Sequence, residues 1–202
     1  EKIFFVNEIT MLKYQKKFIS SYFNEVISPS LGIIVLDNIK KIPNLKDNLS
    51  FLLIRMRLED SEIKHAIIHF PKSLKRFTQL PSDDENSYVI MIDDIIRYYL
   101  KKIFKIFKIK SINANMIKIS RDAELDFDDD ISKSYLEKIS ESIQDRYSGH
   151  PVRFVYDSKM PNDTLDFILK KINIDIETDS VIPGGKYHNR RDYMSFPSMN
   201  QN

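Results

Sequence analysis

The chain has 202 residues, 42% of them hydrophobic and 30% charged, and its acidic and basic residues nearly cancel to a net charge of +2. This length suffices for one generous domain or two small ones, and the small net charge gives no global sign of a nucleic-acid binder. The absence of cysteine excludes disulfides, thiolate nucleophiles and zinc–cysteine sites. No apolar run approaches the roughly 20 residues that span a bilayer, and no signal-peptide pattern opens the chain. We therefore expect a cytoplasmic protein without a membrane span.

The first residues of the chain have the apolar composition expected in the interior of a helix or strand. Its first residue is not methionine, and the apolar run at 3–6 follows at once. We therefore expect the chain to be part of a longer polypeptide. Residues 8–27 are predicted as an amphipathic helix, which Pro29 and Gly32 end. The side chains expected on its buried face recur at helical spacing and are Phe18, Ile19, Tyr22 and Val26.

Strand-like segments follow this helix. They are predicted at residues 33–36, 49–56 and 64–70. The last two are expected to be neighbouring antiparallel strands joined by a turn at 59–61, and the region between Pro71 and Pro81 is predicted as a loop. His65 and His69 fall on one face of the same strand, but no third ligand accompanies them, so no metal site is predicted.

The next part of the chain has the clearest periodicity. Strands are predicted at 88–92, 114–120 and 152–156, and helices at 94–107, at 132–146 and from Pro161 to about 171. Asp93 or Asp94 is expected to cap the first of these helices. The strands at 88–92, 114–120 and 152–156 are expected to share one sheet. We predict an α+β fold with a mixed, largely antiparallel β-sheet that helices cover.

Two charged segments are candidate sites. An aspartate cluster could bind magnesium, but it precedes a predicted helix, where carboxylates favour the positive end of the helix dipole; its members are Asp126, Asp128, Asp129 and Asp130. The stretch between Ile95 and Arg121 contains no acidic residue. Its basic residues are Arg97, Lys101, Lys102, Lys105, Lys108, Lys110 and Lys118. Such a block suits an anionic polymer, but an ordinary solvated helix face has the same composition.

The last twenty residues are predicted to be irregular, basic and rich in aromatic side chains. Lys186, Arg190 and Arg191 lie close together in the sequence, either as phosphate contacts or as a charged linker. Gly184-Gly185 is not followed by the Lys-Ser/Thr of a nucleotide-binding loop. The pair is predicted to form a turn with positive φ, or to bring backbone N–H groups close to a phosphate chain.

Four segments, in chain order, resemble the polyphosphate kinase family. Residues 92–98 (IDDIIRY) are similar to the family's LLDNILRY, and residues 119–125 (ISRDAEL) resemble its TRDAE strand end. Residues 149–156 (GHPVRFVY) match the family's next segment. Residues 180–189 (SVIPGGKYHN) are similar to its VPGGRYHNFKDF segment. The resemblance covers nearly the whole chain and is least specific in the first thirty residues.

The resemblance implies a domain without the reaction centre. Family members have an N-terminal helical domain, a head domain and two C-terminal domains like phospholipase D, which hold the phosphorylated histidine and the magnesium-associated arginines. They transfer the terminal phosphate of ATP reversibly to polyphosphate. The chain resembles the head domain, with residues 1–182 as the domain and 183–202 as a basic segment leading toward the absent catalytic domains. No histidine of the chain aligns with the catalytic position, so the chain alone is expected to be inactive.

Partners and site residues follow from the same resemblance. ATP and magnesium are expected for the longer enzyme and no cofactor for this chain. The expected partners are the enzyme's own catalytic domains, a second subunit and the polyphosphate chain, without nucleic acid. The predicted polyphosphate contacts are Lys186, Arg190, Arg191 and Arg121. The alternatives are a stand-alone module that binds nucleic acid or another polyanion, based on the basic block, and a metal-dependent hydrolase, based on the aspartate cluster.

Overall fold

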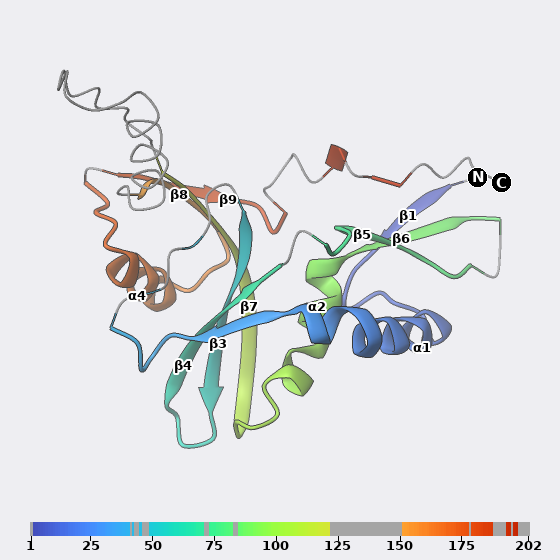
Figure 1. Ribbon diagram of the computed structural model, residues 1–202, viewed down its shortest axis with the longest axis horizontal. Coiled ribbons are helices and arrows are strands. Elements are labelled where there is room, and N and C mark those ends of the chain that lie inside the picture. The colour runs from blue at the N-terminus through green and yellow to red at the C-terminus, as the bar shows by residue number, and fades with distance from the viewer. Residues whose placement is uncertain are drawn as a thin grey trace, which may run out of the picture. The chain divides into compact units, whose positions relative to one another are not determined.

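A computed structural model of the chain provides the structure (Figure 1). It describes residues 2–40, 42, 45, 49–70, 73–82, 85–121, 151–177, 179–187, 193, 194, 196 and 197, with the backbone alone at 121, 151 and 152. The helices are α1 (Lys13–Tyr22), the π-helical turn η1 (Phe23–Ile27), the 3₁₀ turn η2 (Ser28–Ser30), α2 (Ile92–Ile103) and α4 (Asn162–Ile172). The predicted helix at 132–146 and the aspartate cluster lie outside the described residues.

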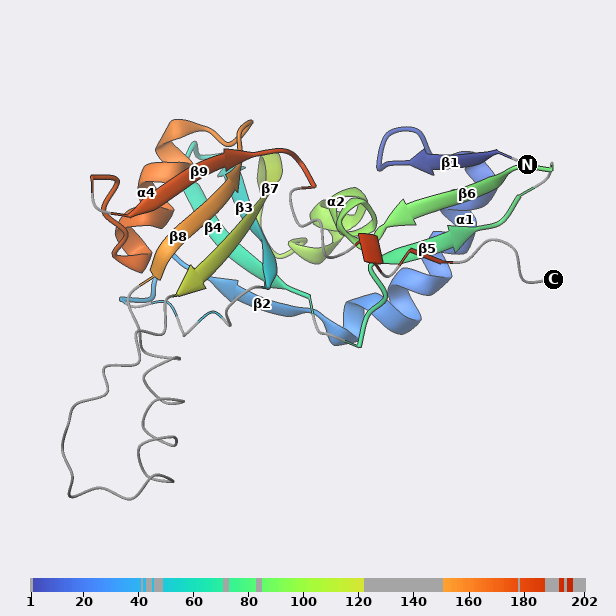
Figure 2. The ribbon, with the colours of Figure 1, turned by 90° about the horizontal axis from the view of Figure 1, so that it is seen from above.

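The described strands belong to two sheets. They are β1 (Ile3–Val6), β2 (Gly32–Val35), β3 (Ser50–Leu58), β4 (Ile63–His69), β5 (Phe77–Leu80), β6 (Ser87–Met91), β7 (Ile109–Arg121), β8 (Pro151–Asp157) and β9 (Ser180–Gly184). One sheet has the order β1-β6-β5 and the other the order β2-β4-β3-β7-β8-β9 (Figures 1 and 2). Parallel and antiparallel pairs occur in both, which confirms the predicted mixed α+β fold.

The chain divides into two compact units. Unit 1 consists of Glu1–Asp37, Leu52–Ala114 and Asn189–Asn202, and unit 2 of Asn38–Phe51 and Asn115–His188. Unit 1 contains the three-stranded sheet with α1 and α2, and unit 2 contains β8, α4 and β9. Both units therefore combine helices with strands, and each collects segments that are far apart in the sequence.

The expectation of a single sheet is wrong for residues 88–92. β6 pairs in parallel with β1, with Phe4 opposite Tyr88, and antiparallel with β5, with Gln79 opposite Val89. β7 and β8 do pair with each other, with Ile119 opposite Phe154. Strand periodicity reports which face of a strand is apolar but does not select its neighbour. β5 lies in the region predicted as a loop, where four residues give little periodic signal.

Of the residues predicted on the buried face of helix α1, Ile19 is buried, but Phe18 and Val26 are not. The helix begins at Lys13 because the Gln15 side chain accepts a hydrogen bond from the Leu12 backbone N–H at 2.9 Å, so the predicted start at residue 8 is wrong. Phe18 and Val26 each remain 40% exposed. The buried stripe is Met11, Gln15, Ile19, Phe23 and Ile27. Both stripes repeat every four residues and are apolar, so spacing could not decide which one faces the core.

Helix α2 begins at Ile92 without a side-chain cap, so the expected capping role of Asp93 and Asp94 is wrong. Both carboxylates are buried in the first turn and form ion pairs instead. The Asp93 carboxylate lies 2.9 Å from an Arg76 guanidinium nitrogen, and the Asp94 carboxylate lies 3.0 Å from one of Arg97. Because these carboxylates are buried, loss of either arginine partner would leave a costly unpaired charge.

The turn between β3 and β4 follows the prediction. The two strands are neighbours in the sheet, and the Leu58 backbone N–H donates to the Glu62 carbonyl at 2.8 Å across the turn. Ser61 takes the left-handed conformation, with φ 73°. This local hydrogen bonding is what the short polar sequence between two apolar runs predicts.

Unit 2 contains a β–α–β crossover. β8 and β9 are parallel, with Phe154 opposite Val181, and α4 connects them (Figure 2). Parallel strands cannot be joined by a tight hairpin, so a helix in the connection is expected. Pro161 precedes the helix at its N-cap position, close to the predicted start. β9 was not expected to be a strand.

An aromatic cluster brings the last described residues onto the three-stranded sheet of unit 1. The Phe196 ring lies 5.5 Å from the Phe5 ring and 5.3 Å from the Phe77 ring, between ring centroids. The Tyr193 ring lies 5.8 Å from the Phe77 ring. Offset and edge-on ring pairs of this kind add to the stabilisation that burial provides. We refer to these four residues as the aromatic clasp.

The clasp predicts that Phe196 contributes to stability although it lies near the end of the chain. Phe196→Ala should lower the free energy of unfolding by about 1–2 kcal/mol, because a half-buried ring loses part of its transfer energy and its ring contacts. Urea unfolding followed by circular dichroism measures this change. Met194→Ala is the matched control, since Met194 is 88% exposed. Equal losses for the two variants would contradict the packing of Phe196 on the sheet.

Candidate anion-contacting site

The β–α–β crossover of unit 2 positions Lys186, the best described of the predicted phosphate contacts. Asp157 ends β8 and lies opposite Gly184, which ends β9. The Ser158 backbone N–H donates to the Gly184 carbonyl at 2.9 Å, so the two strand ends are held together. Gly185 and Lys186 then leave the sheet at this edge. The site is therefore built on two fixed strand ends.

The Asp157 carboxylate supports this edge from inside. It is buried and accepts a hydrogen bond from the Asn115 side-chain amide at 3.3 Å. Its other oxygen accepts from the Lys159 backbone N–H at 3.0 Å. Because both oxygens have partners within the protein, Asp157 fixes the turn after β8 and is not exposed to repel an anion.

Lys186 is half-buried, with its ammonium nitrogen 5.2 Å from the centroid of the Tyr187 ring. The neighbouring Gly185 is exposed, and a Cβ atom added there would meet no atom within 4 Å. No described glycine has positive φ, so the expected left-handed turn at Gly184-Gly185 is wrong. A turn can be made with negative φ throughout, and neither φ nor internal packing explains glycine at 185.

The structure does not bring Arg121 to Lys186. Arg121 ends β7 opposite Pro151, the first residue of β8, whereas Lys186 follows the strand paired with the last residues of β8. The length of β8 separates the two positions by about 20 Å at the usual rise per strand residue. Arg190 and Arg191 lie outside the described residues.

The basic block is divided between surface and interior. Its exposed lysines are Lys101, Lys102, Lys105, Lys108 and Lys110. Arg97 is different, because it pairs with the buried Asp94 and its Nε donates to the Ala114 carbonyl at 3.4 Å. The Arg97 guanidinium is therefore engaged in contacts inside unit 1 and does not belong to the surface that a polymer could contact. The exposed lysines fit either a polyanion surface or a solvated face.

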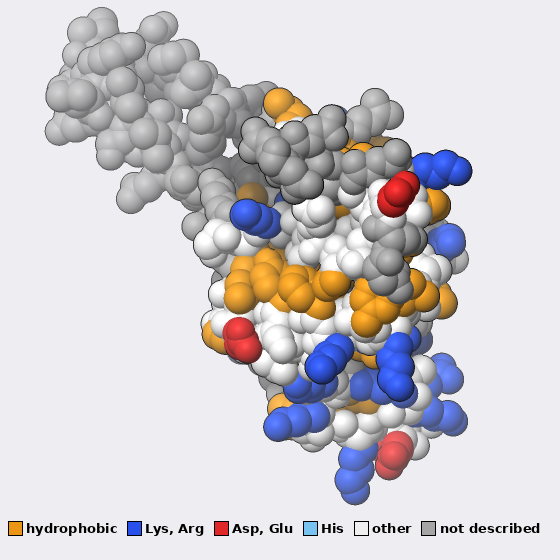
Figure 3. Space-filling model, turned by 90° about the vertical axis from the view of Figure 1, so that its right-hand side faces the viewer, with side chains coloured by type: hydrophobic (Ala, Val, Ile, Leu, Met, Phe, Trp, Pro, Cys, Tyr) orange, Lys and Arg blue, Asp and Glu red, His pale blue; other side chains and the backbone are white. Residues whose placement is uncertain are grey.

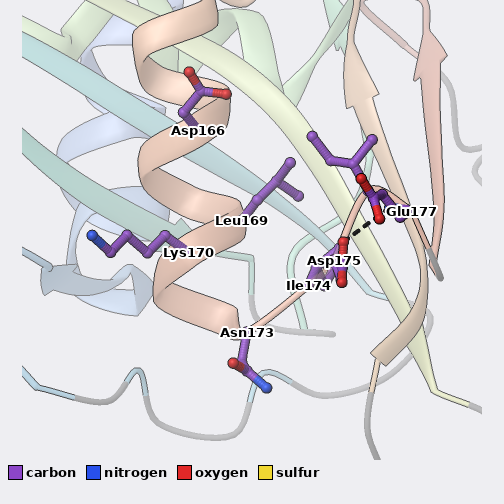
Figure 4. A pocket seen from close by; sticks show the side chains of 8 residues that line it. Asp166, Leu169, Lys170, Asn173, Ile174, Asp175 and Glu177 are labelled. Carbon is purple, nitrogen blue, oxygen red and sulfur yellow. Dashed lines mark hydrogen bonds between the residues drawn. The ribbon is translucent and has the colours of Figure 1, made fainter.

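A cavity of about 620 Å³ in unit 2 is unsuited to a polyanion. It opens between α4 and the turn that follows, and three carboxylates and one ammonium line it (Figure 4). These residues are Asp166, Asp175, Glu177 and Lys170. The Asp175 side chain also accepts a hydrogen bond from the Glu177 backbone N–H at 3.0 Å, which shapes the turn. Like charges would repel phosphate here.

His65 is buried and contacts the Asp37 carboxylate through both its ring and its backbone. His65 is 5% exposed, and its ring nitrogen lies 3.7 Å from the Asp37 carboxylate. The His65 backbone N–H also donates to this carboxylate at 2.8 Å. Among the described residues, no group of three or more potential metal ligands comes together. None of the described helices is both long and apolar enough to cross a membrane.

Sequence reasoning missed an apolar surface on unit 1. Hydrophobic side chains form a band on the face that Figure 3 shows, with lysine and arginine side chains gathered beside it. Exposed apolar residues of this unit include Ile3, Phe4 and Phe5 on β1, Phe18 on α1 and Val26 on η1. A groove of about 420 Å³ follows α1 and η1, lined by Tyr14, Lys17, Phe18, Ser21, Tyr22, Glu25 and Val26. The repeat of apolar residues every four positions was visible in the sequence but was assigned to the core.

Comparison with known proteins places the chain in a kinase family. Residues 14–196 match the family model described as the polyphosphate kinase middle domain. The chain is 36% identical to the polyphosphate kinase of Vibrio parahaemolyticus and 32% identical to that of Escherichia coli K12. Each alignment covers 98% of this chain and 29% of the relative. The chain therefore spans about three-tenths of the length of these curated relatives.

A solved structure has the same fold. The crystal structure of polyphosphate kinase from Porphyromonas gingivalis superposes with a TM-score of 0.75 at 24% sequence identity, covering 98% of this chain and 28% of that one. The mixed sheets and helices described above thus have the fold of one part of that crystal structure. The chain belongs to the polyphosphate kinase family and corresponds to its middle domain.

Proposed function

We propose that this chain is a non-catalytic domain of an enzyme that transfers the terminal phosphate of ATP reversibly to polyphosphate. Its roles are to contact a second subunit and to shape the path of the polyphosphate chain. ATP and magnesium are bound by other domains of that enzyme, which works in the cytoplasm. The observation that carries this proposal is the middle-domain match over residues 14–196.

The proposed lack of catalysis is supported by the described side chains. A phosphoryl acceptor must be reachable by the γ-phosphate, whereas His65 is buried beside Asp37. The cavity beside α4 is lined by three carboxylates and one ammonium group, a balance that disfavours ATP. Gly184 and Gly185 lie at the end of a strand, without the helix N-terminus on which a nucleotide-binding loop depends.

The isolated chain should neither hydrolyse ATP nor become phosphorylated. Incubation with γ-labelled ATP and magnesium, followed by electrophoresis at neutral pH, should leave the protein unlabelled. A full-length enzyme of the family, treated in the same way, is the positive control. Acid-labile label retained by the isolated chain would contradict the proposal.

Subunit contact is supported by the exposed stripe of α1 and η1. The Phe18 and Tyr22 rings stack at 6.3 Å between centroids, and Val26 continues the stripe at the same four-residue spacing. Rows of residues four apart form the ridges with which helices pack against each other. Lys17 lines one part of the groove and Glu25 another, so two antiparallel copies would bring opposite charges together. A second copy of this chain is the occupant that this arrangement fits.

A charge placed in the stripe should break the contact. Phe18→Arg should convert a dimer into a monomer in sedimentation velocity, because an arginine buried in an apolar interface would lack a partner. Ile106→Arg introduces the same charge at a residue that is 82% exposed and lies in a turn, and should leave the dimer intact. A wild-type chain that stays monomeric at high concentration, or a Phe18→Arg dimer, would rule out this interface.

The polyphosphate path is proposed to follow the segment around Lys186 in preference to the lysines of α2. The space beside Gly185 is open, since a Cβ atom added there would meet no atom within 4 Å, and Lys186 supplies a positive charge next to it. In the sequence, Arg190 and Arg191 add donors that can pair with phosphate in a forked geometry. Helix α2, in contrast, commits one face to the core, so its lysines serve well as solubilising charges.

Two triple variants of a full-length enzyme compare these surfaces. Replacing Lys186, Arg190 and Arg191 by alanine should weaken polyphosphate binding more than replacing Lys101, Lys105 and Lys108. Each lost phosphate contact should lower the salt dependence by about 0.7 units of slope, the value for single-stranded polyanions. A larger loss in the α2 variant would contradict the assignment. Preference for DNA over polyphosphate in the same titration would favour the alternative, a general polyanion-binding module.

A further inference from the structure

A small cavity in unit 1 has a composition that the proposed function does not use. Its volume is about 260 Å³, and it lies where η1, η2 and β2 meet the end of α2. Four apolar side chains line it: Phe23, Leu31, Ile33 and Ile103. The remaining lining residues are Ser28, Lys102 and Lys105. The lining therefore combines four apolar side chains with two lysines, both of them exposed residues, and it includes no carboxylate.

The ammonium group of Lys102 is held in place. It lies 2.6 Å from the Asn24 side-chain oxygen and 5.6 Å from the ring centroids of both Phe23 and Tyr99. These two rings stack on each other at 4.1 Å between centroids, with an interplanar angle of 18°. A cation over aromatic rings is attracted by their π-electrons. A group restrained in this way loses less freedom when a ligand binds, so the site is preorganised.

Lys105 brings a second positive charge to the same cavity from the turn that follows α2. The Phe104 backbone N–H donates to the Leu100 carbonyl at 3.0 Å, and the Phe107 N–H donates to the Phe104 carbonyl at 3.0 Å. These bonds fix the turn that carries Lys105. Lys102 retains donors beyond the one that Asn24 accepts, since an ammonium has three. Two ammonium groups at one cavity favour an anion between them.

We propose that this cavity binds a small amphiphilic anion, with one phosphate or carboxylate group and an aromatic or short aliphatic body. The two ammonium groups recognise the acid, and Ser28 can donate one hydrogen bond to it. The apolar wall recognises the body. Polyphosphate has no apolar part to cover that wall, and the volume is below that of pockets for drug-sized ligands. This site is therefore independent of the proposed polyphosphate path.

Phenyl phosphate is the probe, because it joins one phosphate group to one ring. Isothermal titration calorimetry on the intact chain should detect its binding. Inorganic phosphate lacks the ring and phenol lacks the charge, so each should bind at least about tenfold more weakly, the ratio that corresponds to 1.4 kcal/mol. Equal affinities for phenyl phosphate and inorganic phosphate would overturn the proposal, because they would show that the apolar wall is not used.

Charge-neutral variants test the two ammonium groups. Lys102→Met and Lys105→Met should each weaken phenyl phosphate binding by about tenfold, as expected for a lost charge-assisted hydrogen bond. Lys101→Met removes the same charge from an exposed residue of α2 that does not line the cavity, and should change the affinity less than twofold. Asn24→Ala removes the hydrogen bond to Lys102 but keeps the charge of Lys102. This variant should cause an intermediate loss of affinity for phenyl phosphate. Equal losses for Lys101→Met and Lys102→Met would show non-specific attraction and overturn the site.

A separate measurement excludes misfolding as the cause of weaker phenyl phosphate binding in the variants. Lys102 contacts Asn24 and two rings, so its replacement could disturb η1. Amide spectra of each variant without ligand should overlay on the wild type outside the cavity. The ring of phenyl phosphate should then show nuclear Overhauser contacts to the methyl groups of Leu31 and Ile103 in the wild-type chain. Contacts only to methyl groups that do not belong to Leu31, Ile33 or Ile103 would place the ligand elsewhere and refute the proposal.

Discussion

Two buried ion pairs at the start of α2 fix the arrangement of unit 1. Asp93 is fully buried and pairs with Arg76, which precedes β5, and the Ile92 backbone N–H donates to the Arg76 carbonyl at 3.0 Å. Asp94 pairs with Arg97, whose Nε reaches a carbonyl of β7. An unpaired charge in the interior costs several kcal/mol. Removing either partner of the Arg76–Asp93 pair would therefore disturb the point where β5 begins beside β6.

These pairs also determine which charges remain for function. They withdraw two carboxylates and two guanidinium groups from the surface, and the exposed charges between residues 101 and 110 are all lysines. In unit 2 the carboxylates instead gather around the turn after α4. The net charge of +2 therefore does not describe the local charge at either place. The proposed contact with a polyanion would depend on this local charge, because local charge governs encounter with polyanions while net charge does not.

The sequence predicted elements with strong local signals. Helix α2, the β3–β4 turn and β8 combine an apolar period with clear end signals, and they lie close to the expected residues. It could not choose between the two apolar stripes of α1, nor find β5 and β9, because partners distant in the sequence decide both. The same limit applied to the candidate site. Arg121 and Lys186 were grouped by charge, and only the register of β8 separates them.

The aromatic clasp has a consequence for how the chain acquires its structure. Phe196 packs on β1, so unit 1 gathers contacts from the first and the last described residues, and the chain passes through unit 2 between them. Long-range contacts slow folding because the intervening loop must close before they form. On the ribosome, the Phe5 and Phe77 rings would emerge long before Phe196 and would stay partly uncovered. Until Phe196 has been synthesised, the apolar surface of this sheet is therefore uncovered and available to chaperones.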